Sequence, residues 1–274
     1  MLDVLVKVEP GLKPYLFNKK DGNQSINFGE PDAVRLLNKA LLKSDYKIDF
    51  WDIPPGHLCP GVPGRADYIH YTADFLKGKF KSIKGLKCLD IGTGPSVIYP
   101  LIGHRIHNWS FIATEVDEVS LRSAKGIVTA NGLKAKIDLR GQSDRKQLIK
   151  NLLSPDEKID LVICNPPFYS SIEEAMENSQ RKISNLKLRP KDKSTFDGTK
   201  SELTYPGGEL AFVKLLIEET SQLKSQIKWA SSLISKNDHL PNLIKFLEFK
   251  KVKEHSILNM HLGNKKLRIL IWRY

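Results

Sequence analysis

Apolar residues in the central part of the chain recur with two different spacings. Short, nearly continuous apolar runs, typical of buried strands, occur in LKCLDIG (86–92), SFIATEVD (110–117), KAKIDLR (134–140) and KIDLVIC (158–164). Between them, helical spacing predicts helices after Ser96, over Val119–Asn131 and near Asp144–Leu153. Strands that alternate with helices in this way predict a right-handed parallel sheet with helices on both faces.

The C-terminal third continues the same sheet. We expect a helix over Leu210–Lys224, a strand at KWASSLI (228–234), a helix over Leu240–Phe249 and two last strands around VKEHSIL (252–258) and KLRILIWR (266–273). The predicted fold class is therefore α/β, with a doubly wound, mostly parallel, seven-stranded sheet of the Rossmann-like kind.

The N-terminal part lacks this alternation. Residues 1–30 have little apolar periodicity and suggest a loosely packed arm, and a helix follows from Glu30 to Leu42. A loop rich in Pro and Gly spans Ile53–Arg65, and helical spacing resumes over Ala66–Leu76. We predict an arm and helix (1–52) packed on a Rossmann-like domain (53–274), in which the polar segment Ser170–Pro206 forms a mobile loop.

Composition narrows the class of protein. Hydrophobic residues make up 41% and charged residues 27%, which is ordinary for a folded chain. The net charge of +12 favours a polyanionic partner, although solvated lysines would produce it too. No signal peptide or membrane-spanning stretch is apparent, so we expect a cytoplasmic protein with no membrane partner. The three cysteines and seven histidines lack metal-ligand spacing, which predicts free thiols and no metal.

The first candidate site is a glycine turn that follows the strand LKCLDIG. Glycines let the backbone approach a bound ligand closely. Val97 stands where a dinucleotide fingerprint has its third glycine, which argues against a cradle for pyrophosphate. S-adenosylmethionine contains no phosphate and suits such a turn. The residues expected to contact it here are Asp90, Gly92, Thr93, Gly94 and Ser96.

Two charged residues are further candidates for the same ligand. Glu115 ends the second strand about 20 residues after the glycine turn, where a carboxylate accepts hydrogen bonds from ribose hydroxyls. The alternative is a solvated strand-end carboxylate. Arg65 lies in PGRADYIH (63–70), and its guanidinium could bind the methionine carboxylate or pair with Asp67. The spacing leaves both roles open.

The most specific motif is Asn165-Pro166-Pro167-Phe168, directly after the strand IDLVIC. The lone pair of an adenine amine is delocalised into the ring, so methylation requires the nitrogen to become more tetrahedral. The side-chain oxygen of Asn165 and the carbonyl of Pro166 could accept the two amine hydrogens and favour that geometry. The prolines fix the backbone, and Phe168 could stack on a base. The alternative is a simple strand-ending turn.

Basic residues gather in the segment that follows this motif. A loop with this charge suits phosphate contacts around a structured RNA, whereas the lysines between Lys79 and Lys87 are better explained by solubility. The RNA-binding candidates are Arg181, Lys182, Lys187, Arg189, Lys191 and Lys193.

Six segments together resemble the RlmF/methyltransferase-like-sixteen family of RNA adenine-N6 methyltransferases: PGRADYIHY, LDIGTGPSVIYPLIG, ATEVD, CNPPF, GGELAFVKLLIEE and GNKKLRILIW. The resemblance runs from about Phe28 to the C-terminus. It implies the class I methyltransferase fold and an S-adenosylmethionine cofactor. It also implies that Arg65, Gly92, Ser96, Glu115 and Gln142 line the cofactor, and that the Asn165–Phe168 motif holds the target adenine, with Asn165 bordering the cofactor too.

The family resemblance also implies the substrate class. Bacterial members methylate one adenine of large-subunit ribosomal RNA, and eukaryotic members act on a spliceosomal small nuclear RNA or a messenger RNA hairpin. The wording PGRADYIH is nearer the bacterial form. The sequence departs from the family in its short basic arm, at Pro95 and between Ser194 and Gly207.

Two other functions remain open at this stage. Methylation of a protein glutamine amide also uses an Asn-Pro-Pro turn, but that family typically ends the motif in Tyr rather than Phe. A protein that binds RNA without turnover would keep the fold, although the complete Asn-Pro-Pro-Phe motif argues against it.

Overall fold

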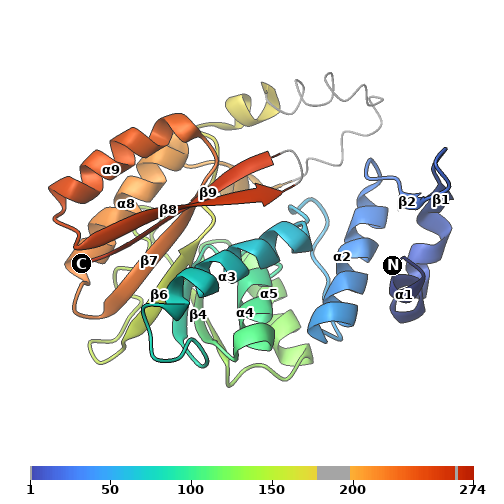
Figure 1. Cartoon of the computed structure of the whole chain (residues 1–274), viewed down its shortest axis with the longest axis horizontal. Coiled ribbons are helices and arrows are strands. Elements are labelled where there is room, and N and C mark those ends of the chain that lie inside the picture. Colours follow the sequence, from blue (N-terminus) through green and yellow to red (C-terminus); the bar gives the residue numbers. More distant parts are fainter. Residues whose placement is uncertain (1, 178–197, 263–264) are drawn as a thin grey trace.

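The computed structural model contains one central sheet with helices on both sides and a smaller N-terminal unit beside it (Figure 1). It describes residues 2–177, 198–262 and 265–274. In chain order the elements are α1 (Leu2–Val8), η1 (Pro10–Tyr15), β1 (Leu16–Asn18), β2 (Gln24–Ile26), α2 (Pro31–Tyr46), α3 (Val62–Lys77), β3 (Lys87–Ile91), α4 (Ile98–His107), β4 (Ser110–Glu115), α5 (Glu118–Ala130), β5 (Ile137–Gly141), β6 (Ile159–Cys164), α7 (Lys200–Leu203), α8 (Gly208–Gln222), β7 (Ile227–Ile234), η3 (Asn237–His239), α9 (Leu240–Phe249), β8 (Glu254–Leu262) and β9 (Lys265–Arg273).

The central sheet has seven strands in the order β5-β4-β3-β6-β7-β9-β8. The strands from β5 to β7 are parallel, and β9 and β8 complete the sheet as an antiparallel pair. The order reverses between β3 and β6, which is the position where open α/β sheets bind ligands beyond the carboxyl ends of their strands. The predicted α/β fold with a mostly parallel, seven-stranded sheet is confirmed.

Each face of the sheet is buried against its own layer of helices. In β6, Leu161 and Ile163 pack with α3, α4 and α5, whereas Val162 and Cys164 pack with α8 and α9. Alternate residues of a strand point to opposite faces, so a strand covered on both sides needs apolar residues at every position. This requirement explains the unbroken apolar run Leu161–Cys164, whereas Asp160 before it is partly exposed and pairs with Lys228 at 2.7 Å.

The N-terminal unit is more ordered than the sequence suggested. Residues 1–30 were expected to form a loose arm, but they contain α1, η1 and the β1–β2 hairpin, which pack with α2 around Leu5, Leu12 and Ile26. The arm prediction is wrong because each of these elements is too short to show a period, and their apolar residues meet only after the chain folds back.

A second prediction also fails. The segment Asp144–Leu153 was expected to be helical, but it forms successive turns. The backbone N–H groups of Leu148, Ile149 and Lys150 all donate to the buried carboxylate of Glu219 on α8, at 2.6–3.2 Å. A helix would require these groups to face carbonyls within the same segment, and the charge-assisted bonds to Glu219 replace them.

Other boundaries moved by a few residues. Helix α3 begins at Val62, inside the expected loop, because Pro63 occupies its first turn, where no backbone N–H is required. The expected loop Ser170–Pro206 contains the short helix α7, which begins with a capping box between Thr199 and Glu202. Within the described residues, no helix is long and apolar enough to cross a membrane.

Candidate active site

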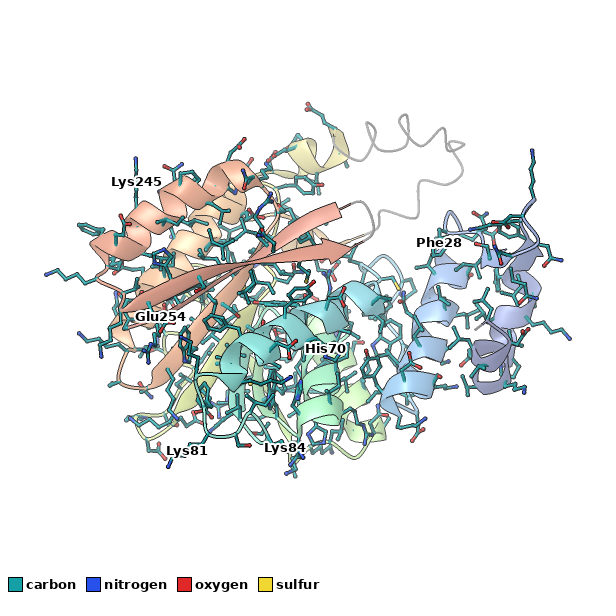
Figure 2. All side chains as sticks on the ribbon, viewed as in Figure 1. Phe28, His70, Lys81, Lys84, Lys245 and Glu254 are labelled. Carbon is teal, nitrogen blue, oxygen red and sulfur yellow. The ribbon has the colours of Figure 1, made fainter. Side chains whose placement is uncertain are left out.

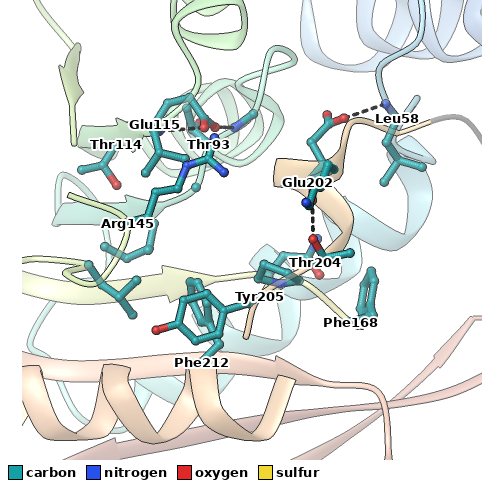
Figure 3. A pocket seen from close by; sticks show the side chains of 18 of the residues that line it. Leu58, Thr93, Thr114, Glu115, Arg145, Phe168, Glu202, Thr204, Tyr205 and Phe212 are labelled. Carbon is teal, nitrogen blue, oxygen red and sulfur yellow. Dashed lines mark hydrogen bonds between the residues drawn. The ribbon is translucent and has the colours of Figure 1, made fainter. Parts of the chain in front are cut away.

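A cavity of about 720 Å³ opens beyond the carboxyl ends of the central strands. Its lining comes from the turn after β3, the end of β4, the segment after β5 and the motif after β6. In Figure 3, Glu115 and Thr93 lie on one side of this pocket and Phe168 on the other, with Tyr205 and Phe212 below. The sequence-predicted residues that line it are Arg65, Gly92, Thr93, Gly94, Ser96, Glu115, Gln142, Asn165, Pro167 and Phe168. Asp90 and Pro166 lie directly beside lining residues in the chain and are themselves buried.

The glycine turn after β3 has an unusual backbone. Gly92 and Gly94 have φ of 67° and 65°, which only glycine adopts without strain. Val97 also has positive φ, at 45°, and its side chain is fully buried. A β-branched residue in this region is strained, so the surrounding structure must hold the turn in place.

Glu115 joins the glycine turn to the end of β4. Its carboxylate accepts hydrogen bonds from the backbone N–H groups of Gly94 (2.9 Å), Val116 (2.7 Å) and Asp117 (3.0 Å). Burial raises the pKa of Glu115, while these three N–H groups oppose the rise. Glu115 is only 8% exposed, so the alternative of a solvated strand end is wrong. A carboxylate has about four acceptor positions, so one remains for a ligand in the cavity.

Asp90, at the end of β3, is a buried carboxylate whose two oxygens find no hydrogen-bond partner among the residues described. Burial raises the pKa of Asp90 to about 7, and the charge of Glu115 adds to the rise, while the nearby Thr93 hydroxyl and the charge of Arg65 oppose it. The buried hydroxyl of Thr93 and that of Tyr99 are likewise unpartnered within the described part of the chain. Unsatisfied buried groups are rare in folded proteins, and a cluster of them marks a place prepared for a polar ligand.

Arg65 lies on the first turns of α3, with its guanidinium 5.8 Å from the centre of the Tyr99 ring. Its positive charge lowers the pKa of Asp90 and therefore acts near that carboxylate. No ion pair between Arg65 and Asp67 is found in the described part of the structure. The side chain of Arg65 lines the cavity instead.

Gln142 holds the segment after β5 rather than presenting a free amide. Its side chain accepts a hydrogen bond from the Asp144 backbone N–H (3.1 Å) and donates to the Lys150 carbonyl (3.4 Å). With Glu219 behind them, these bonds shape the turns that bring Arg145 and Leu148 to the cavity.

The Asn165–Phe168 motif leaves the end of β6 at the cavity. The side-chain oxygen of Asn165 is buried and has no hydrogen-bond partner within the described ranges. Pro167 and Phe168 are half-buried and line the same space. The cavity therefore contains an unsatisfied oxygen acceptor and an aromatic ring from four consecutive residues.

Helix α8 begins close behind this motif. Gly208 has φ of 65°, and a Cβ atom there would lie 3.3 Å from the backbone nitrogen of Ser170. The Tyr169 carbonyl accepts a hydrogen bond from the Tyr205 N–H at 3.0 Å, and Gly208 N–H donates to the Tyr205 carbonyl at 2.7 Å. These contacts fix the chain that leaves the motif and explain the Gly207-Gly208 pair in the sequence.

Some lining residues carry no sequence signal. Glu202 on α7 accepts a hydrogen bond from the Leu58 backbone N–H at 3.3 Å and lies 3.4 Å from His57 Nδ1. It thereby connects the proline-rich loop to the segment before α8, and Figure 3 shows the bond to Leu58. Tyr205 and Phe212 pack edge to face, 5.0 Å apart. Only long-range folding brings these residues together, so local patterns could not identify them.

The predictions on RNA-binding residues and on metal binding can also be compared with the structure. The RNA-binding candidates Arg181, Lys182, Lys187, Arg189, Lys191 and Lys193 lie outside the described residues. Lys81 and Lys84 precede β3 and extend outward at the lower edge of the molecule in Figure 2, as a solvated face would. Among the residues described, no group of three or more His, Cys, Asp or Glu side chains could hold a metal ion.

Sequence comparisons place this chain among known proteins. Residues 2–274 match a family described as RNA methyltransferase. Ribosomal RNA large subunit methyltransferase F of Pseudomonas putida (strain W619) is 44% identical over 98% of this chain and 88% of its own. The protein of the same name from Bacteroides fragilis (strain YCH46) is 42% identical over 98% of this chain and 93% of its own.

Solved structures agree with this placement. The catalytic domain of human METTL16 in complex with MAT2A 3'UTR hairpin 1 is similar with a TM-score of 0.85 and 33% identity, over 98% of this chain and 89% of that domain. The N-terminal domain of human METTL16 in complex with SAH is similar with a TM-score of 0.78 and 30% identity, over 98% of this chain and 92% of that domain. The fold is therefore that of the Rossmann-like class I methyltransferases, and this chain belongs to the family of RNA methyltransferases that its motifs resemble.

Proposed function

We propose that this enzyme uses S-adenosylmethionine to methylate the exocyclic amine of one adenine in large-subunit ribosomal RNA. The observation that carries the proposal is the buried, unpartnered side-chain oxygen of Asn165, which faces the same cavity as the glycine turn and Phe168. An acceptor in this state is prepared for a donor that arrives with the substrate, and an amine of a nucleobase supplies two.

The residues present fit the cofactor. The α-ammonium group of the cofactor needs an anion, its carboxylate needs a cation and its ribose hydroxyls need an acceptor. Arg65 and Glu115 line the cavity and offer the cation and the acceptor, and Asp90, directly beside the lining, offers the anion. The bent backbone of Gly92 and Gly94 leaves open space where side chains would otherwise stand. When bound, S-adenosylmethionine supplies a sulfonium methyl group as the electrophile.

The protein's own contribution is to position and polarise the target amine. Asn165 Oδ1 and the Pro166 carbonyl accept its two hydrogens, which favours the tetrahedral nitrogen that methyl transfer requires. Phe168 stacks on the adenine ring, since a base must leave its own stack to reach the cavity. The two prolines limit the movement of these acceptors.

The choice of RNA rests on the relatives. Those at 40–44% identity over nearly the whole chain carry the name ribosomal RNA large subunit methyltransferase F. The second candidate is an RNA hairpin, because human METTL16 at 33% identity is known in complex with one. The higher identity favours ribosomal RNA.

A methylation assay with separate pools of substrate tests the proposed reaction and the choice of RNA independently. We expect radiolabelled methyl groups to enter large-subunit ribosomal RNA, and not an RNA hairpin or a pool of cell protein, when each is incubated with enzyme and cofactor. Label in the hairpin alone would replace the first candidate with the second. No label in any RNA, despite cofactor binding, would contradict the proposal.

The Asn165→Ala variant tests the role of the acceptor. We expect kcat to fall by about a hundredfold or more, as on removal of a preorganised catalytic hydrogen-bonding group. Cofactor affinity, measured by calorimetry without RNA, should stay within about threefold of the wild type. A variant that loses cofactor affinity but keeps kcat would show that Asn165 holds the cofactor rather than the target amine.

A further inference from the structure

Two carbonyl groups of the cofactor turn are held by side chains from outside the cavity. The Pro95 carbonyl accepts a hydrogen bond from the hydroxyl of Ser123 on α5, at 3.1 Å. The Ser96 carbonyl accepts one from the indole N–H of Trp51, at 3.0 Å. Pro95 and Ser96 both line the cavity, so these bonds attach part of its wall to two separate regions of the protein.

The indole of Trp51 is itself firmly placed. It is 1% exposed, and it lies in the connection between α2 and α3. The side chain of Asn131, at the end of α5, accepts hydrogen bonds from the backbone N–H groups of Asp49 and Phe50 and donates to the Phe50 carbonyl at 2.6 Å. The indole that donates to the Ser96 carbonyl is therefore held in place through Asp49 and Phe50, the two residues immediately before Trp51.

The turn needs such anchors because of its backbone conformation. Val97 follows the two held carbonyls and adopts φ of 45°, a region that costs a β-branched residue free energy. A strained conformation persists only where neighbouring contacts determine it. The Trp51 and Ser123 hydrogen bonds act on the two residues that precede the strained position, one bond on each residue.

We propose that Trp51 and Ser123 are positioning residues for cofactor binding, which hold the strained turn Pro95–Val97 in the shape that the cofactor requires. The inference rests on the proposed function, since it assumes that this cavity binds S-adenosylmethionine. Neither side chain lines the cavity, so both act through the backbone of the turn.

Trp51→Phe tests the indole bond, because phenylalanine keeps an aromatic ring and removes the N–H donor. We expect the dissociation constant of S-adenosylmethionine, measured by calorimetry without RNA, to rise about fivefold or more, since a buried carbonyl loses its partner. Ser123→Ala should weaken binding in the same direction. In assays with RNA, the KM for cofactor should rise in both variants while kcat at saturating cofactor stays unchanged.

Trp109→Phe is the matched control. Trp109 is also fully buried and donates its indole N–H to a backbone carbonyl, that of Ile83. It directly precedes β4, at the amino ends of the strands, whereas the cavity lies beyond their carboxyl ends. We expect it to lower the midpoint of thermal unfolding without changing cofactor affinity.

Three results would decide against the inference. Wild-type affinity in both Trp51→Phe and Ser123→Ala would overturn it, and so would equal weakening in Trp109→Phe, which would indicate a general loss of stability. If Trp51→Phe fails to fold, Ser123→Ala alone decides, because Ser123 is a half-exposed helix residue whose replacement by alanine is well tolerated. A wild-type protein that does not bind S-adenosylmethionine would instead refute the proposed function, and this inference with it.

Discussion

Asp90 combines complete burial with an ionisable side chain that has no partner in the described residues. Its pKa of about 7 in the folded protein lies above the ordinary value of 3.8. The ionised form therefore opposes folding, and this cost is absent below about pH 4, grows between pH 4 and 7, and is complete above pH 7. A buried group that destabilises the fold is expected where function requires it.

Asp90→Asn tests this balance. The amide cannot ionise, so we expect the free energy of unfolding to rise by about 1–3 kcal/mol at pH 8, with the gain disappearing near pH 4. The cofactor affinity should fall at the same time, because the amide offers no charge to an ammonium group. Denaturant unfolding at both pH values and calorimetry at pH 8 measure the two effects.

Asp238→Asn, at an exposed position of η3, serves as the control and should change neither quantity. Equal unfolding free energies for Asp90→Asn and the wild type across the whole pH range would show that the carboxylate is already compensated in the folded state.

At the scale of residues, the sequence identified the parts of the site that are contiguous in the chain. The glycine turn and the Asn165–Phe168 motif each directly follow a buried strand, and parallel neighbours β3 and β6 bring their carboxyl ends to the same place. Trp51 reaches the same region from the connection between α2 and α3, and Glu202 and Tyr205 reach it from the segment before α8. Their spacing in the sequence carries no periodic signal, so only the folded chain identifies them.

At the scale of elements, the sequence predicted long and regular helices and strands best. Helix α9 has the predicted bounds Leu240–Phe249 because it is a regular amphipathic segment. The helix near Asp144–Leu153 was wrong because Glu219, about 70 residues further on, captures the backbone N–H groups of that segment. A local pattern cannot report a partner at that distance, and here tertiary contacts override helix propensity.

The junction between α8 and the Asn165–Phe168 motif leads to a prediction of its own. In Gly208→Ala, the new Cβ would lie 3.3 Å from the Ser170 nitrogen and 3.5 Å from the Tyr169 carbonyl carbon. We expect the chain after Phe168 to shift, and kcat to fall about tenfold or more, because small displacements of catalytic groups cost much activity. Cofactor affinity should be nearly unchanged, since the cofactor turn lies on another strand.

Gly132→Ala is the matched control for backbone strain. Gly132 has a similar φ of 67°, in the turn between α5 and β5, but a Cβ atom there meets nothing within 4 Å. Both variants should lose about 1–2 kcal/mol of stability, the ordinary cost of a left-handed conformation. Equal kcat values for the two would show that α8 does not position the motif.

At the scale of the whole molecule, a net charge of +12 is combined with a cavity in which Glu115 is buried and Arg65 is half-buried. These two features respond differently to salt. Lysines and arginines on the surface attract phosphates over a distance that salt shortens, whereas ionic contacts inside a cavity are screened much less. RNA binding and cofactor binding should therefore separate when ionic strength is varied.

We expect RNA affinity to fall steeply with salt, while the dissociation constant of S-adenosylmethionine changes by less than about twofold. With about five phosphate contacts, the RNA affinity should drop by roughly 10²–10³ between 50 and 200 mM salt. Filter binding of ribosomal RNA and calorimetry with the cofactor, at the same set of salt concentrations, give the two slopes. A logarithmic slope for RNA of less than about one would mean that the basic surface contributes little, and that recognition rests on the cavity and its immediate rim.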